Sequence, residues 1–370
     1  MDLSEYWRRM VRGEGGTYLA LLRTLLVPAA AFYGAAAWLY RMSYDCGLRA
    51  RTQPALPTLS VGSLVLGGAG KTTVTAHLAQ RLVGAGQNPA IVLRGYRGRA
   101  EGTLVASEGG KLLVGPEVAG DEAVLLTKLC PGATVVVGKR REDAIGVAAR
   151  LGATCALLDD GFQYFRMRRD VDLILVNALQ CGTSMRMFPA GILREPLSFL
   201  SRAHQVWITY SQAVSAAELE ALCSWVRRWA PRAALVVTSH RIGCCRRLSD
   251  GTPVDIQGRR LAAFCGIGSP EGFQASLEAL GVAGVNLRGF PDHHRFTPAD
   301  LRGVAEWAQS EGADCVVTTA KDAVRIGAKD WPAAAPPLIV AEVELQVEAG
   351  IEHVKEAVAL LSQPVARQQQ

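Results

Sequence analysis

The feature that most constrains the fold of this 370-residue chain is a glycine-rich loop between a predicted strand and a predicted helix. Residues 56–61 are predicted to form a strand, and apolar residues at helical spacing begin at Val74. Strand, glycine loop and helix in this order are typical of a phosphate-binding loop, whose backbone N–H groups converge on phosphate oxygens. The candidate nucleotide-binding residues are Gly67, Gly68, Ala69, Gly70, Lys71, Thr72 and Thr73.

Two residues at the end of this loop carry more specific expectations. Lys71 would reach the β- and γ-phosphates of a nucleotide, and the Thr72 hydroxyl would bind Mg²⁺. The usual pattern has glycine five residues before Gly70, where this chain has Val65, so the start of the motif is shifted to Gly62. A glycine turn without nucleotide is the alternative, but the intact Gly-Lys-Thr end favours ATP and Mg²⁺ as cofactors.

Short apolar runs alternate with helical patterns through the following 150 residues. Near-continuous Val, Ile and Leu strands separated by helices predict a mostly parallel sheet covered on both faces. The expected fold class is therefore α/β, similar to P-loop NTPases. The predicted strands are 90–93, 133–137, 155–158, 171–176 and 205–209, and the predicted helices are 121–129, 142–151 and 216–229.

A second, smaller α/β unit is predicted after a polar stretch at residues 241–260. Its expected strands are 261–267, 315–318 and 338–343, and its expected helices are 271–280, 300–310 and 351–361. The predicted organisation is an N-terminal helical segment (1–54), a P-loop kinase domain (55–240) and a C-terminal subdomain that completes the cleft (241–365).

The N-terminal segment contains 17 uncharged residues, 24–40. A helix of that length rises about 25 Å, less than the roughly 30 Å of bilayer hydrocarbon. Asp2, Glu5 and Glu14 argue against a cleaved signal peptide, and a helix buried against the domain is the other alternative. We expect a helix that associates with a membrane without spanning it, near arginines that suit anionic headgroups: Arg8, Arg9, Arg12, Arg23, Arg41, Arg49 and Arg51.

Composition excludes several classes of protein. The 40 Lys and Arg against 34 Asp and Glu give a net charge of +6, too small to indicate nucleic acid as a partner but suited to phosphate groups. The nine cysteines show no CxxC spacing, so neither a zinc site nor a disulfide scaffold is predicted.

Polar residues follow several of the predicted strands, where ligands bind in open α/β sheets. Asp159 and Asp160 come directly after one strand and could hold Mg²⁺, although a turn with solvated acids is the alternative. Gly120-Asp121-Glu122 opens a helix, which leaves simple helix capping as its alternative. The basic residues after two other strands suggest contacts with polyanionic substrates, with a solvated face as the alternative: Arg94, Lys139, Arg140 and Arg141. Residues 189–196 predict an ordered loop that holds Arg194 and Glu195 between prolines.

The pair His293-His294 follows Asp292 in the second unit. A histidine that reaches the cleft could orient a carboxylate base. An Asp-His-His run also suggests metal-dependent phosphoesterases, but no supporting set of Asp and His ligands is evident. Structural surface histidines are the remaining alternative.

Taken in order, these segments resemble the tetraacyldisaccharide 4′-kinases of lipid A biosynthesis over nearly the whole chain. The matching pieces are Gly67–Thr72, Arg94-Gly95-Tyr96, Gly120-Asp121-Glu122, Asp159-Asp160-Gly161-Phe162-Gln163, Arg169-Asp170, Pro189-Ala190-Gly191, Leu193-Arg194-Glu195-Pro196, Gly266-Ile267-Gly268 and Asp292-His293.

The resemblance implies a monomeric kinase at the cytoplasmic face of the bacterial inner membrane. It would move the γ-phosphate of ATP to the 4′-hydroxyl of a tetraacyl glucosamine disaccharide 1-phosphate, which forms lipid IVA. Asp121 would be the catalytic base and His293 its partner. Carried over in the same way, Asp159, Asp160, Gln163 and Glu195 would surround the metal and nucleotide, while Arg94, Glu122, Arg140, Arg141 and Arg194 would contact substrate.

The chain departs from the family pattern at four positions. Tyr164 stands where a histidine is usual, Ala320 replaces an acid, Asn177 replaces a frequent aspartate, and Thr73 stands in place of proline. Two rival functions therefore stay open: a regulatory P-loop ATPase or GTPase, with residues 319–322 as a partial guanine-reading motif, and a non-catalytic membrane-binding module.

Overall fold

The computed structural model describes residues 6–7, 10–11, 16–95, 98–99, 101–180 and 185–363. Its strands are β1 (Thr58–Ser63), β2 (Pro89–Leu93), β3 (Thr103–Glu108), β4 (Lys111–Leu112), β5 (Thr134–Gly138), β6 (Cys155–Asp159), β7 (Val171–Asn177), β8 (Gln205–Thr209), β9 (Ala234–Arg247), β10 (Arg260–Cys265), β11 (Gly284–Gly289), β12 (Cys315–Thr319) and β13 (Leu338–Ala349). Its α-helices are α2 (Gly16–Leu25), α3 (Val27–Asp45), α4 (Lys71–Gly84), α5 (Pro116–Ala119), α6 (Asp121–Leu129), α7 (Arg141–Arg150), α8 (Ala216–Trp229), α9 (Pro270–Glu278), α10 (Pro298–Ser310), α11 (Ala320–Ala323) and α12 (Ile351–Ser362).

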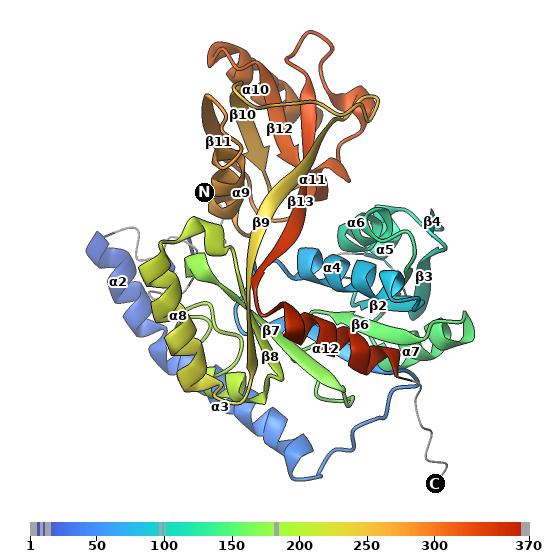
Figure 1. Ribbon diagram of the computed structural model, residues 1–370. Helices are drawn as coiled ribbons and strands as arrows, with labels where there is room; N and C mark the ends of the chain where they lie inside the picture. Colours follow the sequence, from blue (N-terminus) through green and yellow to red (C-terminus); the bar gives the residue numbers. More distant parts are fainter. Residues whose placement is uncertain are drawn as a thin grey trace.

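Within these residues a single sheet runs through the molecule (Figure 1), in the order β11-β10-β12-β13-β9-β8-β7-β1-β6-β2-β5-β3-β4. The strands from β8 to β5 are parallel, and β3 joins this edge antiparallel to β5. Alternate residues of one strand enter different cores: Ile91 packs in the cluster that contains Leu78 of α4, and Val92 packs in the cluster that contains Ile145 of α7. The predicted parallel sheet with helices on both faces is confirmed.

Strands β9 and β13 join the two parts of the sheet. Residues 234–237 of β9 pair with β8, and residues 237–247 pair antiparallel with β13. The chain therefore crosses to the C-terminal part on β9 and returns on β13, after which α12 packs on α4 (Figure 1).

The interpretation of residues 241–260 as a polar linker is wrong for residues 241–247. These residues alternate in burial, because Ile242 and Cys245 face the core while Arg241 and Arg246 face solvent. A strand with one solvated face resembles a polar loop in sequence. The two-unit division remains a prediction, and its boundary at position 240/241 falls inside this strand.

The C-terminal part repeats the layered arrangement at smaller scale. β10, β11 and β12 are parallel, and the two faces of β10 pack on different helices. Ala263 lies in a core with Phe273 of α9, and Phe264 lies in a core with Leu301 of α10. The strands and helices predicted for the C-terminal part thus form an α/β arrangement. The loops that follow β10 and β12 line the same cleft as the glycine loop.

The N-terminal helices α2 and α3 lie along one side of the main sheet (Figure 1). Tyr33 packs edge-on against Phe188, and Tyr40 and Tyr44 pack against Phe165. Among the described residues no single helix is long and apolar enough to cross a bilayer; α2 and α3 pass that test only as a pair, bent by 42°. The expected headgroup contacts of Arg8, Arg9 and Arg12 lie outside the described residues.

Candidate active site

The glycine loop adopts a conformation that requires glycine at specific positions. Gly67 and Gly68 have φ of 69° and 63°, and Gly70 caps α4 with a φ of 79°. A Cβ at Gly70 would also lie 2.8 Å from Nε2 of the buried His240. Gly62, by contrast, belongs to β1 and packs against Phe162, so the turn of the loop begins later than the sequence suggests.

Side chains from two neighbouring strand ends hold this loop from behind. Asn177, at the end of β7, donates from Nδ2 to the carbonyl oxygen of Gly68 at 2.6 Å. Thr209, at the end of β8, donates to the carbonyl oxygen of Ala69 at 3.1 Å. Because the loop's carbonyls are engaged on this side, its N–H groups can turn toward an anion in the cleft. Asparagine can donate here where aspartate cannot, which gives the departure at position 177 a structural role.

A cleft of about 1350 Å³ opens between the loop and the C-terminal part. Its walls combine the loop, the ends of β2 and β6, and residues that follow β10, β11 and β12. Most of the residues predicted from sequence line it: Gly67–Thr73, Arg94, Glu122, Arg141, Asp159, Asp160, Gln163, Arg194 and His293. Tyr96, the last residue of the Arg94-Gly95-Tyr96 segment, lies outside the described residues.

The two acids after β6 have opposite electrostatic environments. Burial would raise the pKa of Asp160, but Lys71 at 3.6 Å and Arg194 at 2.8 Å outweigh burial and lower that pKa to about 2. Burial and, after it, the nearby charge of Glu122 raise the pKa of Asp159 to about 7, against the opposing charge of Lys71. Asp159 also accepts a long hydrogen bond from Thr75 of α4, at 3.4 Å. Asp160 is therefore already ion-paired, whereas the Asp159 carboxylate needs a cation.

This arrangement fits a Mg²⁺ ion that uses few protein ligands. The described part of the chain holds no group of three or more His, Cys, Asp or Glu side chains able to bind a metal. Mg²⁺ characteristically takes one or two carboxylates together with nucleotide phosphates and water. Asp159 and the Thr72 hydroxyl, which both line the cleft, suit that coordination.

Glu195 lies behind the cleft and does not line it. Gln163 donates from Nε2 to the Ser63 carbonyl at 2.9 Å and to Glu195 Oε2 at 3.4 Å, and Arg202 lies 3.9 Å from the same carboxylate. Burial raises the pKa of Glu195 to about 7 despite Arg202. Glu195 therefore contacts Gln163 and Arg202. It lies outside the cleft that Asp159 and Thr72 line.

The two neighbouring arginines after β5 differ in position. Arg140 is exposed and pairs with Asp143 at 3.0 Å, away from the cleft lining. Arg141 is buried, lines the cleft and donates to the Gly138 carbonyl. Tyr164 lies against Arg141: its hydroxyl accepts from the Arg141 backbone N–H at 3.3 Å and donates to Glu142. The tyrosine that replaces the expected histidine therefore supports the arginine that reaches the cleft.

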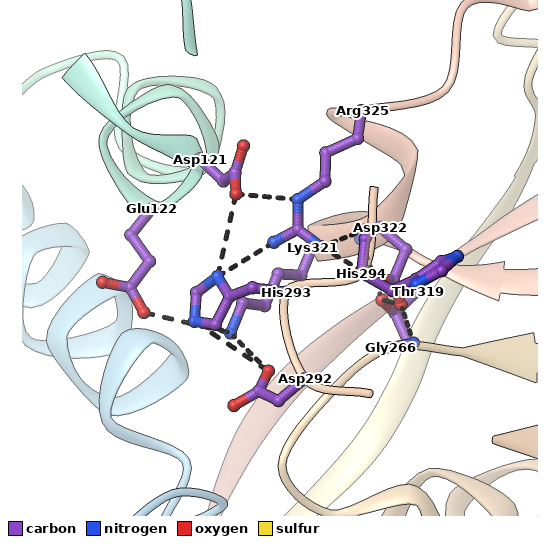
Figure 2. Close-up of polar contacts among 10 residues, drawn as sticks. All are labelled: Asp121, Glu122, Gly266, Asp292, His293, His294, Thr319, Lys321, Asp322 and Arg325. Atoms are coloured by element: carbon purple, nitrogen blue, oxygen red, sulfur yellow. Dashed lines mark hydrogen bonds and ion pairs between the residues drawn. The ribbon is translucent and has the colours of Figure 1, made fainter. Parts of the chain in front are cut away.

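Asp121 of α6 and His293 of the loop after β11 approach each other (Figure 2), and of the two only His293 lines the cleft. Asp121 opens α6, and His293 follows β11 with a φ of 61°. Oδ2 of Asp121 lies 3.7 Å from Nδ1 of His293, just beyond hydrogen-bond range, and 2.7 Å from Nε of Arg325. Burial would raise the pKa of Asp121, but His293 and Arg325 outweigh it and lower that pKa below its ordinary value.

Several residues of the site carry no sequence signal strong enough for prediction. Arg325 and Thr209 stand outside the family's motifs, and Lys321 belongs only to the partial guanine-reading motif. His240 is buried in the middle of β9, where its ring stacks on Tyr210 at 4.0 Å behind Gly70. Only the folded structure shows that these side chains lie at the cleft or beside it.

A phosphate-binding loop with Lys71 and Thr72 at its helical end is shared by P-loop enzymes that use nucleotides, the P-loop kinases among them. Comparison with known proteins agrees with that class. The chain belongs to the tetraacyldisaccharide-1-P 4′-kinase family, whose model matches residues 22–360.

Relatives extend this match along the whole chain. A tetraacyldisaccharide 4′-kinase of Anaeromyxobacter sp. (strain K) is 37% identical, over 99% of this chain and 97% of the relative. One of Geobacter sulfurreducens is 33% identical, over 89% and 91%. The crystal structure of LpxK from Aquifex aeolicus, described as an "apo" form in complex with ATP, is 28% identical, with a TM-score of 0.70 over 92% of this chain and 99% of that one. The resemblance drawn from sequence is confirmed.

Proposed function

We propose that this chain transfers the γ-phosphate of ATP to the 4′-hydroxyl of a tetraacyl glucosamine disaccharide 1-phosphate, which yields lipid IVA. The observation that carries the proposal is one cleft lined by both the lysine-bearing glycine loop and His293, with Asp121 3.7 Å from the His293 ring. The names of the family and of its relatives, and the ATP in the related structure, support the same reaction.

Asp121 is the general base of the proposed reaction. A sugar hydroxyl is a weak nucleophile, and a positioned carboxylate that accepts its proton contributes about 10²–10⁴-fold. The lowered pKa of Asp121 keeps this carboxylate ionised at neutral pH. His293 lies 3.7 Å from the Asp121 carboxylate and lines the cleft, so it can orient the acceptor sugar beside the base.

Lys71 and the glycine loop bind the ATP phosphates, and Asp159 with Thr72 would hold Mg²⁺. When bound, Mg²⁺ would neutralise charge on the β- and γ-phosphate oxygens. Asp160 keeps Lys71 and Arg194 at the mouth of the loop until nucleotide arrives. Arg94 and Arg141 supply further positive charge to the cleft, where the anionic ends of both substrates would lie.

We also propose that α2 and α3 place the cleft at the inner face of the bacterial inner membrane, because the acyl chains of the substrate stay in the bilayer. The two helices expose Leu21, Leu25, Phe32 and Leu39 by 60–78%. Exposed aromatic and aliphatic side chains on one helical surface are typical of interfacial binding. The chain acts as a monomer in this proposal, since one copy supplies both walls of the cleft.

The geometry argues against the rival regulatory NTPase. Asp322, which would read a guanine base in that interpretation, is fully buried and accepts hydrogen bonds from Gly266 N at 3.0 Å and Thr319 Oγ1 at 2.7 Å. Its oxygens are therefore committed to the protein. Lys321 points instead to the His293 ring, at 3.4 Å.

The test is transfer of labelled γ-phosphate from Mg·ATP to tetraacyldisaccharide 1-phosphate in mixed micelles. Wild type should form phosphorylated lipid, and Lys71→Ala and Asp121→Asn should each lose at least about 100-fold in rate. Lys111→Ala and Asp250→Asn, at exposed positions far from the cleft, are the matched controls and should retain wild-type rates. Lipid-independent ATP or GTP hydrolysis without a lipid product would overturn the kinase and favour the regulatory NTPase.

A further inference from the structure

Arg325 lies between Asp121 and His293 and contacts both. Its Nε donates to Oδ2 of Asp121 at 2.7 Å, and its terminal NH2 nitrogen lies 3.1 Å from Nδ1 of His293 (Figure 2). The direct separation between Asp121 and His293 is longer, at 3.7 Å. The hydrogen-bonded connection between the two side chains therefore runs through the guanidinium.

The chemistry of the guanidinium decides the direction of these hydrogen bonds. Arginine carries five N–H donors and no acceptor, so Nδ1 of His293 must accept the proton that Arg325 offers. A ring nitrogen that accepts from Arg325 cannot also donate to Asp121. In this geometry the hydrogen bond to the Asp121 carboxylate comes from Nε of Arg325.

Hydrogen bonds from NH1, the guanidinium nitrogen that contacts neither Asp121 nor His293, hold Arg325 in this position. The Arg325 side chain is only 6% exposed, and its NH1 nitrogen donates to the His294 carbonyl at 3.2 Å and to Asp322 at 3.4 Å. Asp322 is itself anchored by Gly266 N and Thr319 Oγ1. A fork held at both ends has little rotational freedom left to lose, which suits a group that sets the position of others.

We propose that Arg325 is a positioning residue for the transfer reaction, joining the base on α6 to the histidine of the C-terminal part so that the two meet in one geometry. This inference rests on the proposed function, because it presumes that Asp121 accepts the proton of the sugar hydroxyl. Arg325 follows α11 in the C-terminal part and Asp121 opens α6 in the N-terminal part, so their contact joins the two parts beside the cleft.

Electrostatics support the same role. Among the described residues, the charged and titratable groups that contact Asp121 are Arg325 and His293, while Glu122, the next residue of α6, lies 3.9 Å from Lys321. Arg325 is the permanent cation among those in direct contact, and it favours the ionised carboxylate. Its removal should raise the pKa of Asp121 and so shift the acid limb of the pH profile to higher pH.

The experiment measures kcat, KM for each substrate and the pH dependence of kcat/KM in full-length wild type, Arg325→Gln, Arg325→Lys and Arg288→Gln. Arg288, on the edge strand β11, packs over Trp307 of α10 and serves as the matched control. Arg325→Gln should lower kcat by about 10–100-fold, as expected when a catalytic group is misplaced by about 1 Å. Its KM for ATP should change by less than about threefold, and its acid limb should move up by about one pH unit. Arg325→Lys should recover little, since an ammonium cannot form the fork.

Two further measurements separate positioning from general damage. Guanidinium ion at millimolar concentration should restore part of the activity of Arg325→Ala and none of Asp121→Asn. The double variant Asp121→Asn/Arg325→Gln should be no slower than Asp121→Asn alone, because residues that act as one unit are not additive.

The outcomes distinguish the inference from the function on which it rests. Wild-type activity in Asp121→Asn would remove the proposed base, and the inference with it. A dead Asp121→Asn beside an Arg325→Gln with wild-type kcat and an unmoved acid limb would overturn the inference alone. Additive losses in the double variant, without guanidinium rescue, would reduce Arg325 to a structural residue and would also overturn it.

Discussion

Gly68 of the phosphate-binding loop and Gly268 of the C-terminal part meet backbone to backbone. A Cβ placed on Gly268 would lie 2.4 Å from the Gly68 nitrogen, and one placed on Gly68 would lie 2.6 Å from the Gly268 carbonyl oxygen. No side chain intervenes, so neither position has room for any other residue. Gly268 also belongs to the segment whose Gly266 N–H is held by Asp322, which links this contact to the Arg325 network.

Gly268→Ala should therefore weaken ATP binding. The added methyl meets backbone rather than a flexible side chain, and overpacking of this kind costs about 1–3 kcal/mol. We expect the Kd for ATP, measured by titration calorimetry, to rise by at least about tenfold.

The control is Gly303→Ala in α10, where a Cβ would meet nothing within 4 Å. Alanine in a helix interior is favoured over glycine by about 0.5–1 kcal/mol, so this variant should be slightly more stable and bind ATP normally. Equal ATP affinity in both variants would show that the two backbones separate without cost.

Asn177→Ala should weaken ATP binding more mildly. It removes the donor that holds the Gly68 carbonyl at 2.6 Å and the oxygen that accepts from Leu179 N at 2.9 Å. A lost hydrogen bond of this kind costs about 0.5–1.5 kcal/mol, which corresponds to a KM for ATP about 2–10-fold higher. Asn286→Ala, on the exposed strand β11, loses only a surface contact with Glu311 and should leave KM unchanged. A KM rise of the same size in both would contradict the assignment.

Glu195 should give the folded protein a distinctive pH dependence. Its folded pKa of about 7 lies above the ordinary value of 4.5, because burial outweighs Arg202. Between these values the native state binds more protons than the unfolded state, so the free energy of unfolding falls as pH rises from about 4.5 to about 7 and then levels. The full contribution is on the order of 3 kcal/mol.

Urea unfolding from pH 5 to 8 in wild type and Glu195→Gln, without Mg²⁺ or nucleotide, measures this contribution. The variant should lose this part of the slope, while the exposed control Glu306→Gln should keep it. Parallel curves for wild type and Glu195→Gln would mean that Glu195 is already ionised in the folded protein at pH 5.

The sequence predicts best those parts of the molecule in which burial or backbone conformation admits few residue types. β1, β6 and β7 are buried at every position, and the predicted bounds agree with the observed ones within two residues. Gly67, Gly68 and Gly70 are recognisable because positive φ and close packing admit little else. The phosphate-binding half of the site can therefore be predicted from the sequence alone.

The parts that sequence misses depend on long-range contacts. β9 has one solvated face, so its second half resembles a linker, and β11 is an exposed edge strand with only intermediate burial at best. Arg325 is one of many arginines until the fold brings it 2.7 Å from Asp121, which lies 204 positions earlier in the chain. Arg140 and Arg141 are adjacent in sequence, yet the start of α7 turns only the second into the cleft.

Phe32→Glu/Leu39→Glu in α3 should detach the protein from lipid. Phe32 is 78% exposed and Leu39 61% exposed, and burying such side chains in a membrane contributes about 1.5–3 kcal/mol each. Sedimentation with phosphatidylglycerol–phosphatidylcholine vesicles should show at least about tenfold weaker binding than wild type. Leu360→Glu, which adds one such charge at a 51% exposed position on α12, is the control and should bind normally. Unchanged vesicle binding in the double variant would move the membrane contact away from these helices.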